Sequence, residues 1–348
     1  MPRITKLLLS LSVCISLSAC SQLSYYYQAA KGQAQLLNKR QPVEDLLAAA
    51  STPSKLKQQL TKSQKIRRFA VEHMGLKDHG GFTQYADLGR THAVWNVVAA
   101  PEFSIEPRTW CFPIAGCVAY KGFFEQEMAL REQEKLRSQG NDVLVYGVSA
   151  YSTLGWFDDP LLNTFIHYSD TELAALIFHE LSHQVLYIKD DSEFNEAFAT
   201  AVEHAMLESW LRSQGNNDQI QQLADQRLRH GRITELILDF RQQLNSAYVG
   251  EQPAQDKVRL FEEMKRRYAE IQSQAEGTRY YDWWFSQPLN NAYLLTVSTY
   301  FRLVPAFSRM INQEGGDLLA FFESAKALSK KSKSERSLAL ENYLQPSS

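Results

Sequence analysis

The hydrophobic and polar positions of this chain predict strands in one region and helices on both sides of it. Three stretches rich in aromatic and β-branched residues are typical of strands: Ala93–Ala99, Cys117–Phe124 and Asp142–Val148. Apolar residues at helical spacing predict helices elsewhere before residue 140, namely Tyr25–Leu37, Pro42–Ala49, Pro53–Met74 and Glu125–Gln139. Gly75 directly follows one of these stretches and is a typical helix stop.

From residue 169 onward the pattern is almost wholly helical. Two charged amphipathic stretches, Asp218–Ser246 and Gln255–Gln274, are separated by a break at Gly250–Pro253, which predicts a long helical hairpin. Its charges form either a solvated face or a partner surface. The expected fold class is therefore α+β, mostly α, with a small β-sheet before a helical C-terminal part.

The residues with the clearest chemistry lie at the start of this helical region. Residues 179–183 read His-Glu-Leu-Ser-His, the HExxH signature of zinc proteases. On a helix, residues four apart share a face, so His179 and His183 can both reach one metal ion. Glu180 lies one residue round, where its carboxylate can act on a water molecule as general base. A catalytic zinc site needs a third protein ligand.

The residues before the motif predict that it lies inside a helix. Ser169 and Glu172 have capping-box spacing, and Asp170 and Thr171 are alternative caps. The apolar residues that follow keep a helical pattern up to the histidines: Leu173, Leu176, Ile177, Phe178 and Leu181.

Glu196, thirteen positions after His183, is the expected third ligand. A polar break at Lys189–Ser192 separates the motif helix from a second helical pattern, and two helices joined by a short loop should lie antiparallel. That arrangement returns Glu196 to the metal histidines. Other candidates for third ligand are within reach: Glu193, Glu203 and His204. Glu203 is alternatively a hydrogen-bond partner of a ligand histidine or a surface charge.

The N-terminus predicts export and a lipid anchor. A positive segment, Met1–Lys6, precedes the short apolar stretch Leu7–Ala19, which is too short to span a membrane. Residues 17–20 read Leu-Ser-Ala-Cys and resemble the bacterial lipobox, in which the cysteine, here Cys20, is acylated after cleavage. Ser21 follows in place of the Asp that favours inner-membrane retention, so we expect the periplasmic face of the outer membrane. An ordinary secretory signal is the alternative.

The remaining cysteines agree with an oxidising compartment. Cys14 would leave with the signal peptide and Cys20 would carry lipid, which leaves Cys111 and Cys117. We expect these two to form a disulfide, with reduced buried cysteines as the alternative.

Charge and length limit the partners and the domain organisation. The formal charge is −2, and removal of Arg3 and Lys6 with the signal peptide changes it to −4. No basic, aromatic-rich surface is evident, so no nucleic-acid partner is expected. The expected organisation is a signal peptide at 1–19, an N-terminal helical segment at 20–80, a zincin-like catalytic core at 81–215 and a helical part at 216–348.

Two further features concern the substrate cleft. The segment Ser149–Phe157 precedes the motif helix and either lines the cleft or is a structural loop. A tyrosine or histidine usually donates a hydrogen bond to the developing oxyanion. The sequence offers Tyr293, Tyr300, Tyr151 and His167 for this role and does not choose between them.

Several segments together resemble the putative aminopeptidase family of proteobacterial lipoproteins: residues 25–32 (YYYQAAKG), 110–117 (WCFPIAGC), 151–160 (YSTLGWFDDP), 179–184 (HELSHQ) and 194–200 (FNEAFAT). The family is assigned to the gluzincin metallopeptidases. The resemblance implies that His179, His183 and Glu196 bind the metal and that Glu180 is the general base. Well-studied gluzincin aminopeptidases also carry a Gly-x-Met-x-Asn segment, which this sequence lacks, and their ligand glutamate lies further from the second histidine.

These observations predict a zinc-dependent peptidase, an aminopeptidase or an endopeptidase, that acts on peptides or proteins of the envelope. The alternatives are a non-catalytic, zinc-stabilised envelope lipoprotein that binds peptide or protein partners, and a zinc hydrolase with another substrate. The sequence does not indicate the oligomeric state.

Overall fold

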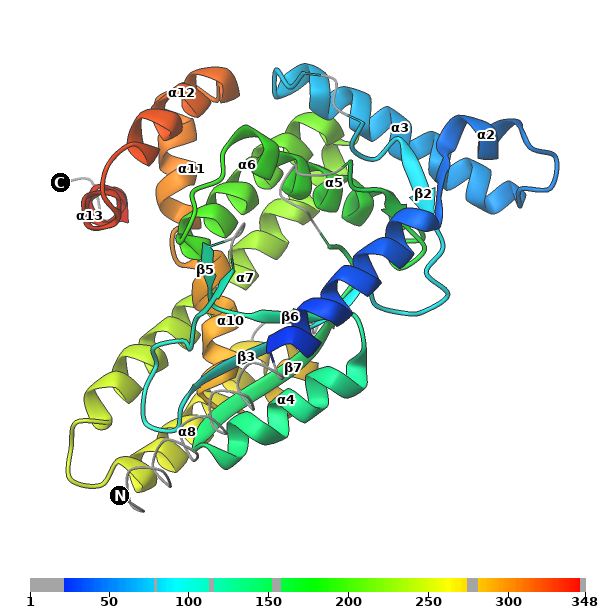
Figure 1. The fold of residues 1–348 in the computed structure, drawn as a ribbon. Helices are drawn as coiled ribbons and strands as arrows, with labels where there is room; N and C mark the ends of the chain where they lie inside the picture. Colours follow the sequence, from blue (N-terminus) through cyan, green and yellow to red (C-terminus); the bar gives the residue numbers. More distant parts are fainter. Residues whose placement is uncertain (1–21, 78–79, 113–115, 152–157, 274–280, 345–348) are drawn as a thin grey trace, which may run out of the picture.

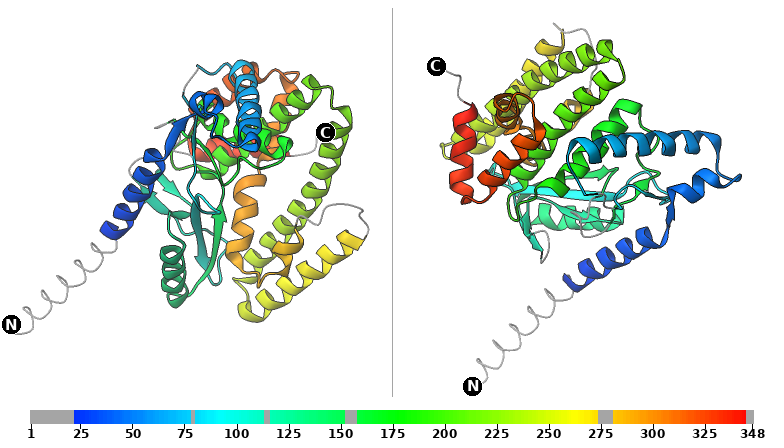
Figure 2. Two further views of the ribbon diagram at one scale, coloured as in Figure 1. Left: turned by 90° about the vertical axis from the view of Figure 1, so that its right-hand side faces the viewer. Right: turned by 90° about the horizontal axis from the view of Figure 1, so that it is seen from above.

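A small antiparallel sheet has helices on both faces in the computed structural model, which describes residues 22–77, 80–112, 116–151, 158–273 and 281–344 (Figures 1 and 2). The sheet has the strand order β6-β3-β7, with β3 at Val94–Pro101, β6 at Lys121–Phe123 and β7 at Asn141–Val148. Helix α4, Gln126–Ser138, covers one face, and α10, Asn291–Phe301, covers the other.

Alternate residues of β3 point to opposite faces of this sheet, which explains the two layers. Val97 and Ala99 pack with Leu136 of α4 in one apolar cluster. Val98 and Ala100 belong to a second cluster with α7, α8 and α10. Helices α7, Asn217–Ala247, and α8, Pro253–Ser273, form the long hairpin predicted from the sequence.

The sequence correctly places two of the three predicted strands, and the third needs correction. Residues 117–124 do not form one strand. Instead β5, Gly116–Val118, pairs with β4, Trp110–Phe112, and β6 pairs with β3. The chain changes partner between β5 and β6, so the strand breaks at Ala119 and Tyr120.

The helices outside these layers contain the largest apolar cluster, whose members range in the sequence from Leu36 to Leu340. The predicted N-terminal helices are present as residues 22–38, α2 at Val43–Ala48 and α3 at Ser54–His73, and Gly75 has the left-handed φ of +61° that suits a helix stop. The short strands β1 (Arg40–Pro42), β2 (Gln84–Ala86) and β8 (Leu161–Leu162) form a separate sheet beside them.

The C-terminal part is helical, as predicted. After α9, Asp282–Ser286, and α10 come α11 at Val304–Gln313, α12 at Leu318–Ser329 and α13 at Lys333–Leu344. None of the helices among the described residues combines the length and the apolar character that a membrane crossing requires. The division of the chain at residues 20, 81 and 216 stays a prediction.

Candidate metal centre

The HExxH motif lies in α5, Asp170–Val185, as its apolar pattern predicts. Ser169 caps this helix: its hydroxyl accepts a hydrogen bond from the Glu172 amide at 3.3 Å, and the Glu172 carboxylate accepts one from the Ser169 amide at 3.1 Å. This capping box satisfies amides that the first turn leaves without helical partners. The apolar face then buries Leu173, Ile177 and Leu181, which leaves the histidines on a neighbouring face.

The next helix, α6 at Ser192–Ser213, passes through the core and is buried on most of its circumference. A short loop joins it to α5, and the Asn195 side chain fastens that loop. The Asn195 amide group donates to the Ile188 carbonyl at 2.7 Å, and its oxygen accepts from the Ile188 amide at 2.8 Å. These two hydrogen bonds attach the first turn of α6 to the loop at Asn195, the residue directly before Glu196.

Three potential ligands meet between these helices. One ligand atom from each of His179, His183 and Glu196 lies within 4.8 Å of the others. The Glu196 Oε2 atom is 3.3 Å from His179 Nε2 and 3.9 Å from His183 Nε2. Ligand atoms around one tetrahedral zinc ion lie about 3.4 Å apart, as bond lengths of roughly 2.1 Å require. The three groups therefore fit a metal ion with little rearrangement.

The protonation of the two histidines differs in the metal-free protein. Burial lowers the pKa of His183 to about 4, against the smaller opposite effect of Glu196, so its ring is neutral and can donate a lone pair. Burial acts in the same direction on His179, but hydrogen bonds to Glu196 and Glu203 raise its pKa well above the usual value. Likewise, burial opposes ionisation of Glu196, yet the neighbouring histidines lower its pKa. A metal cation would replace the proton of His179 in this acidic pocket.

Glu203 holds the other ring nitrogen of His179. Its Oε2 atom lies 3.2 Å from His179 Nδ1, in the carboxylate–histidine arrangement that orients metal-binding imidazoles. The sequence leaves three interpretations of Glu203, as third ligand, as hydrogen-bond partner of a ligand histidine or as surface charge, and the geometry favours the hydrogen-bond partner. His183 Nδ1 is buried without a hydrogen-bond partner among the described residues.

The remaining candidates for third ligand have other contacts. Glu193 forms an ion pair with Arg302, at 2.5 Å and 2.9 Å between the paired atoms. His204 lies one residue beyond Glu203, and neither it nor Glu193 belongs to the group of ligand atoms found among the described residues. Burial and the charges of Arg227, His230 and His179 lower the pKa of His204 to about 3.

The charges of Glu180 and Glu196 both affect the pKa values of two tyrosines. Burial raises the pKa of Tyr120 and of Tyr300 well above the usual value, and the negative charges of Glu196 and Glu180 raise both further. Tyr300 is one of the oxyanion candidates from the sequence. Tyr120 is not among these candidates. It lies at the break between β5 and β6, and its distance in sequence from the HExxH motif gives no signal.

The other oxyanion candidates lie in different surroundings. Tyr293 packs against Trp284, with 5.7 Å between ring centroids, and Tyr151 packs against Phe124 at 5.3 Å. His167 is exposed. Of residues 149–157, which the sequence assigns either to the cleft or to a structural loop, residues 152–157 lie outside the described part of the chain.

A disulfide-closed hairpin contacts the loop between α5 and α6. Cys111 and Cys117 face each other in β4 and β5 and form the predicted disulfide. The Cys117 amide donates to Asp190 Oδ1 at 2.5 Å, and Asp190 has a left-handed φ of +67°. The hairpin therefore holds an unusual backbone conformation in the loop that leads to Glu196.

Helix α13 secures the same loop from another direction. Arg336 donates to Asp191 Oδ2 at 2.5 Å and 3.0 Å, with only 8% and 7% of the two side chains exposed. Lys333 donates to the Asp190 carbonyl at 3.2 Å. The sequence gives no sign of these contacts, because the paired residues are 145 and 143 positions apart.

Comparison with known proteins gives one match. A family model described as "Putative aminopeptidase" matches residues 24–340. No curated protein matches the chain, and no solved structure matches it. The matched range contains the HExxH motif, Glu196 and the contacts of α13 described above.

Proposed function

Since this chain belongs to the putative aminopeptidase family, we propose that it is a zinc-dependent peptidase with a zincin-like centre. In this proposal His179, His183 and Glu196 hold the metal ion and Glu180 is the general base. The observation that carries it is the convergence of one ligand atom from each of His179, His183 and Glu196, which lie within 4.8 Å of one another. Glu180 follows His179 directly in the sequence and is not among these ligands. Three protein ligands leave the fourth position that a catalytic zinc site needs.

The ligand set supports zinc in particular. Two imidazoles and one carboxylate are a known ligand set of catalytic zinc, and the Glu203 contact orients His179 for binding. When bound, the ion supplies Lewis-acid chemistry, which lowers the pKa of a nucleophilic water and polarises the scissile carbonyl.

The side chains then share the proton transfers. Glu180 takes a proton from the attacking water and gives it to the leaving amine, so the peptide bond is hydrolysed without an acyl-enzyme. Tyr300 and Tyr120 keep their protons at neutral pH because burial and the nearby carboxylates raise both pKa values. A neutral phenol can donate a hydrogen bond to the carbonyl oxygen as negative charge develops there.

The substrate is a peptide or protein that the chain meets in the bacterial envelope. We further propose that residues 1–19 direct export and that lipid on Cys20 holds the protein on the periplasmic face of the outer membrane. A tethered catalytic part would then reach peptides of the periplasm and no cytoplasmic ones. The missing Gly-x-Met-x-Asn segment leaves the direction of cleavage to be measured.

The experiment combines metal analysis with digestion of a peptide library that contains free and blocked N-termini. We expect one zinc per chain and cleavage by the wild type. His179→Ala, His183→Ala and Glu196→Ala should each lose stoichiometric zinc, whereas Glu180→Gln should keep zinc and lose turnover. Cleavage restricted to free N-termini would identify an aminopeptidase.

Two outcomes would contradict this proposal in different ways. Turnover by Glu180→Gln close to the wild-type rate would remove the general-base role. Stoichiometric zinc with no cleavage of any peptide would favour the non-catalytic scaffold or a hydrolase with another substrate.

A further inference from the structure

The first helix, residues 22–38, has an apolar stripe that no described part of the protein covers. Its members are exposed and recur at the spacing of one helical face: Leu23, Tyr26, Tyr27, Ala30 and Ala34. The exposed fractions of Leu23 and Tyr27 are 71% and 68%. Single exposed apolar residues are common on protein surfaces, but a row of them along one helix indicates a contact surface.

The opposite face of this helix is firmly attached. Tyr25 packs against Phe123 and Phe112, with ring centroids 5.4 Å and 5.6 Å away. Gln28 is buried, and its side-chain oxygen accepts from the Phe124 amide at 3.0 Å. Gly32 lies so close to the Phe124 ring that a Cβ atom would overlap it. The helix is therefore held rigidly against β6 and cannot turn its stripe inward.

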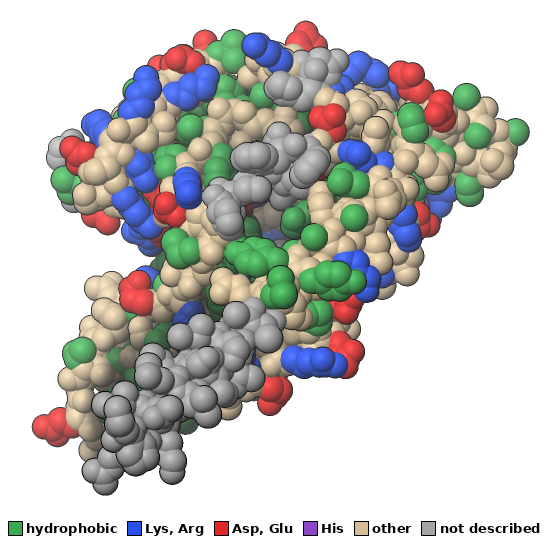
Figure 3. All heavy atoms as spheres, viewed as in Figure 1, with side chains coloured by type: hydrophobic (Ala, Val, Ile, Leu, Met, Phe, Trp, Pro, Cys, Tyr) green, Lys and Arg blue, Asp and Glu red, His purple; other side chains and the backbone are tan. Residues whose placement is uncertain are grey.

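Charge is absent from this end of the mature chain. Residues 21–30 contain no charged side chain, and the first cation, Lys31, lies 3.5 Å from Glu125. Figure 3 shows hydrophobic side chains on the face beside this helix. A solvated surface helix would be expected to carry charges on its outer face.

We propose that the stripe docks into the boundary between the headgroups and acyl chains of the membrane leaflet that holds the lipid of Cys20. This inference rests on the proposed lipid anchor. Tyrosine rings favour that boundary, because it accepts both the apolar ring and the polar hydroxyl. Helices with one apolar face lie in the same layer, parallel to the membrane surface.

The position of the anchor selects a membrane over other occupants. Leu23 follows Cys20 by three positions, a distance of at most about 11 Å even for an extended chain. The beginning of the stripe therefore cannot move far from the bilayer surface once the acyl chains are inserted. Because the helix is attached rigidly to β6, docking would also fix the orientation of the metal centre relative to the membrane.

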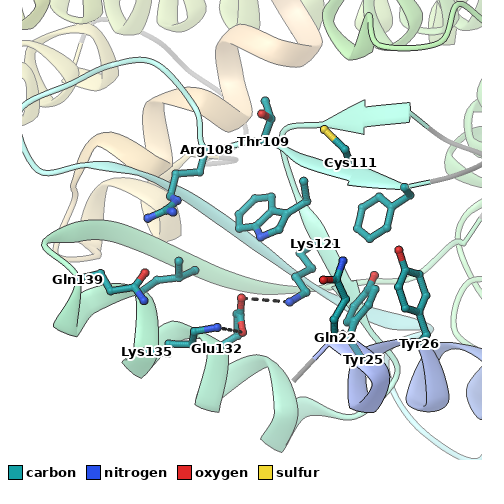
Figure 4. Close-up of a pocket in the computed structure, with 13 residues that line it drawn as sticks. Gln22, Tyr25, Tyr26, Arg108, Thr109, Cys111, Lys121, Glu132, Lys135 and Gln139 are labelled. Atoms are coloured by element: carbon teal, nitrogen blue, oxygen red, sulfur yellow. Dashed lines mark hydrogen bonds and ion pairs between the residues drawn. The ribbon is translucent and has the colours of Figure 1, made fainter. Parts of the chain in front are cut away.

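The surroundings of the helix start are suited to an interface. A pocket of about 510 Å³ lies there, between the helix, β4 and α4. Figure 4 shows Tyr25 and Tyr26 reaching into this region from the helix, opposite the ion pair of Lys121 and Glu132, whose charged atoms are 3.1 Å apart.

The test places a polarity-sensitive fluorophore on an Ala30→Cys variant of the full, acylated chain in vesicles. The introduced thiol would be free, since Cys111 and Cys117 are bonded and Cys20 carries the lipid. We expect emission at shorter wavelength and quenching by bromine-labelled acyl chains. The matched control is Leu338→Cys, a residue that is 62% exposed on α13. Helix α13 lies well away from the first helix in Figure 1. The label on this control should remain in water.

Adding Leu23→Gln and Tyr27→Gln to the Ala30→Cys variant should return the label to water while the protein stays acylated. An acylated protein whose Ala30 label is not quenched by the lipids would overturn docking and leave the anchor intact. A wavelength shift without vesicles that grows with protein concentration would instead assign the stripe to a second copy of the chain. Absence of acyl chains in the mass spectrum would refute the anchor, and this inference with it.

Discussion

Glu196 and Glu203 both contact His179, and their positions indicate different roles. Glu196 shares the metal side of the imidazole, through Nε2, whereas Glu203 binds the opposite nitrogen, Nδ1. A ring held at Nδ1 presents Nε2 in one orientation and one tautomer, which strengthens it as a ligand. Glu203 should therefore tune the affinity for metal without contributing a ligand atom.

We predict that Glu203→Gln weakens zinc binding about 10- to 100-fold while the fold is kept. The amide can still accept a hydrogen bond from Nδ1, but it loses the negative charge that stabilises the cationic centre. Competition with a zinc chelator of known affinity measures the change. Glu208→Gln on the same helix, where Glu208 pairs with Arg212 at the surface, is the control and should bind like the wild type. Equal zinc affinities in Glu203→Gln and Glu208→Gln would show that Glu203 has no role in metal binding.

A second residue-scale prediction concerns the phenols. Tyr300→Phe should lower kcat by about 100- to 1,000-fold without loss of zinc, because it removes a donor to the oxyanion and nothing else. Tyr120→Phe is the parallel test, and the two variants together show which phenol donates. Tyr293→Phe is the control, since burial raises the pKa of Tyr293 without any influence of Glu180 or Glu196. Unchanged kcat in both Tyr300→Phe and Tyr120→Phe would remove tyrosine from the mechanism.

At the scale of elements, the sequence predicts what depends on local signals. The capping box at Ser169 and Glu172 and the apolar face of α5 are both readable within one helix. The long hairpin of α7 and α8 follows in the same way from its periodicity and its break. The convergence of His179, His183 and Glu196 also follows, since a short loop between two helices leaves few geometries.

What the sequence does not predict depends on contacts between distant segments. The charges of Glu180 and Glu196 raise the pKa of Tyr120, which lies where the chain changes strand partner, and no spacing rule reveals such a change. The short strands β1, β2 and β8 have too few residues to show a period of two. The contacts of Arg336 and Lys333 with the loop before Glu196 join residues that are 145 and 143 positions apart in the sequence.

The buried pair of Arg336 and Asp191 gives the prediction at this scale. Arg336→Met should lower the free energy of unfolding by about 3 to 5 kcal/mol, because it leaves the Asp191 carboxylate buried without its cation. The double variant with Asp191→Asn should recover much of that loss. Denaturant unfolding of the metal-free proteins measures both. Arg212→Met, which breaks an exposed pair, should cost at most about 1 kcal/mol. A loss no larger than this in Arg336→Met would show that the buried pair does not stabilise the loop.

At the scale of the whole molecule, N-terminal and C-terminal segments contribute to one apolar core. Leu36 near the N-terminus and Leu340 near the C-terminus belong to the same apolar cluster, which also surrounds α5 and α6. The family match likewise runs from residue 24 to residue 340. The C-terminal helices therefore belong to the same folded unit as the candidate metal centre, because α13 contacts the loop that leads to Glu196.

The proposed lipid anchor gives the prediction at the scale of the whole molecule. Wild-type protein should fractionate with membranes and take up a clickable fatty acid, although no described helix can cross a bilayer. Each buried CH₂ group contributes about 0.8 kcal/mol, so several acyl chains make the attachment persistent. Cys20→Ala should block labelling and the lipoprotein-specific cleavage. An ordinary secretory signal instead predicts an unlabelled, soluble wild type that Cys20→Ala does not alter. In that case the peptidase would act throughout the periplasm and its apolar first helix would need another partner.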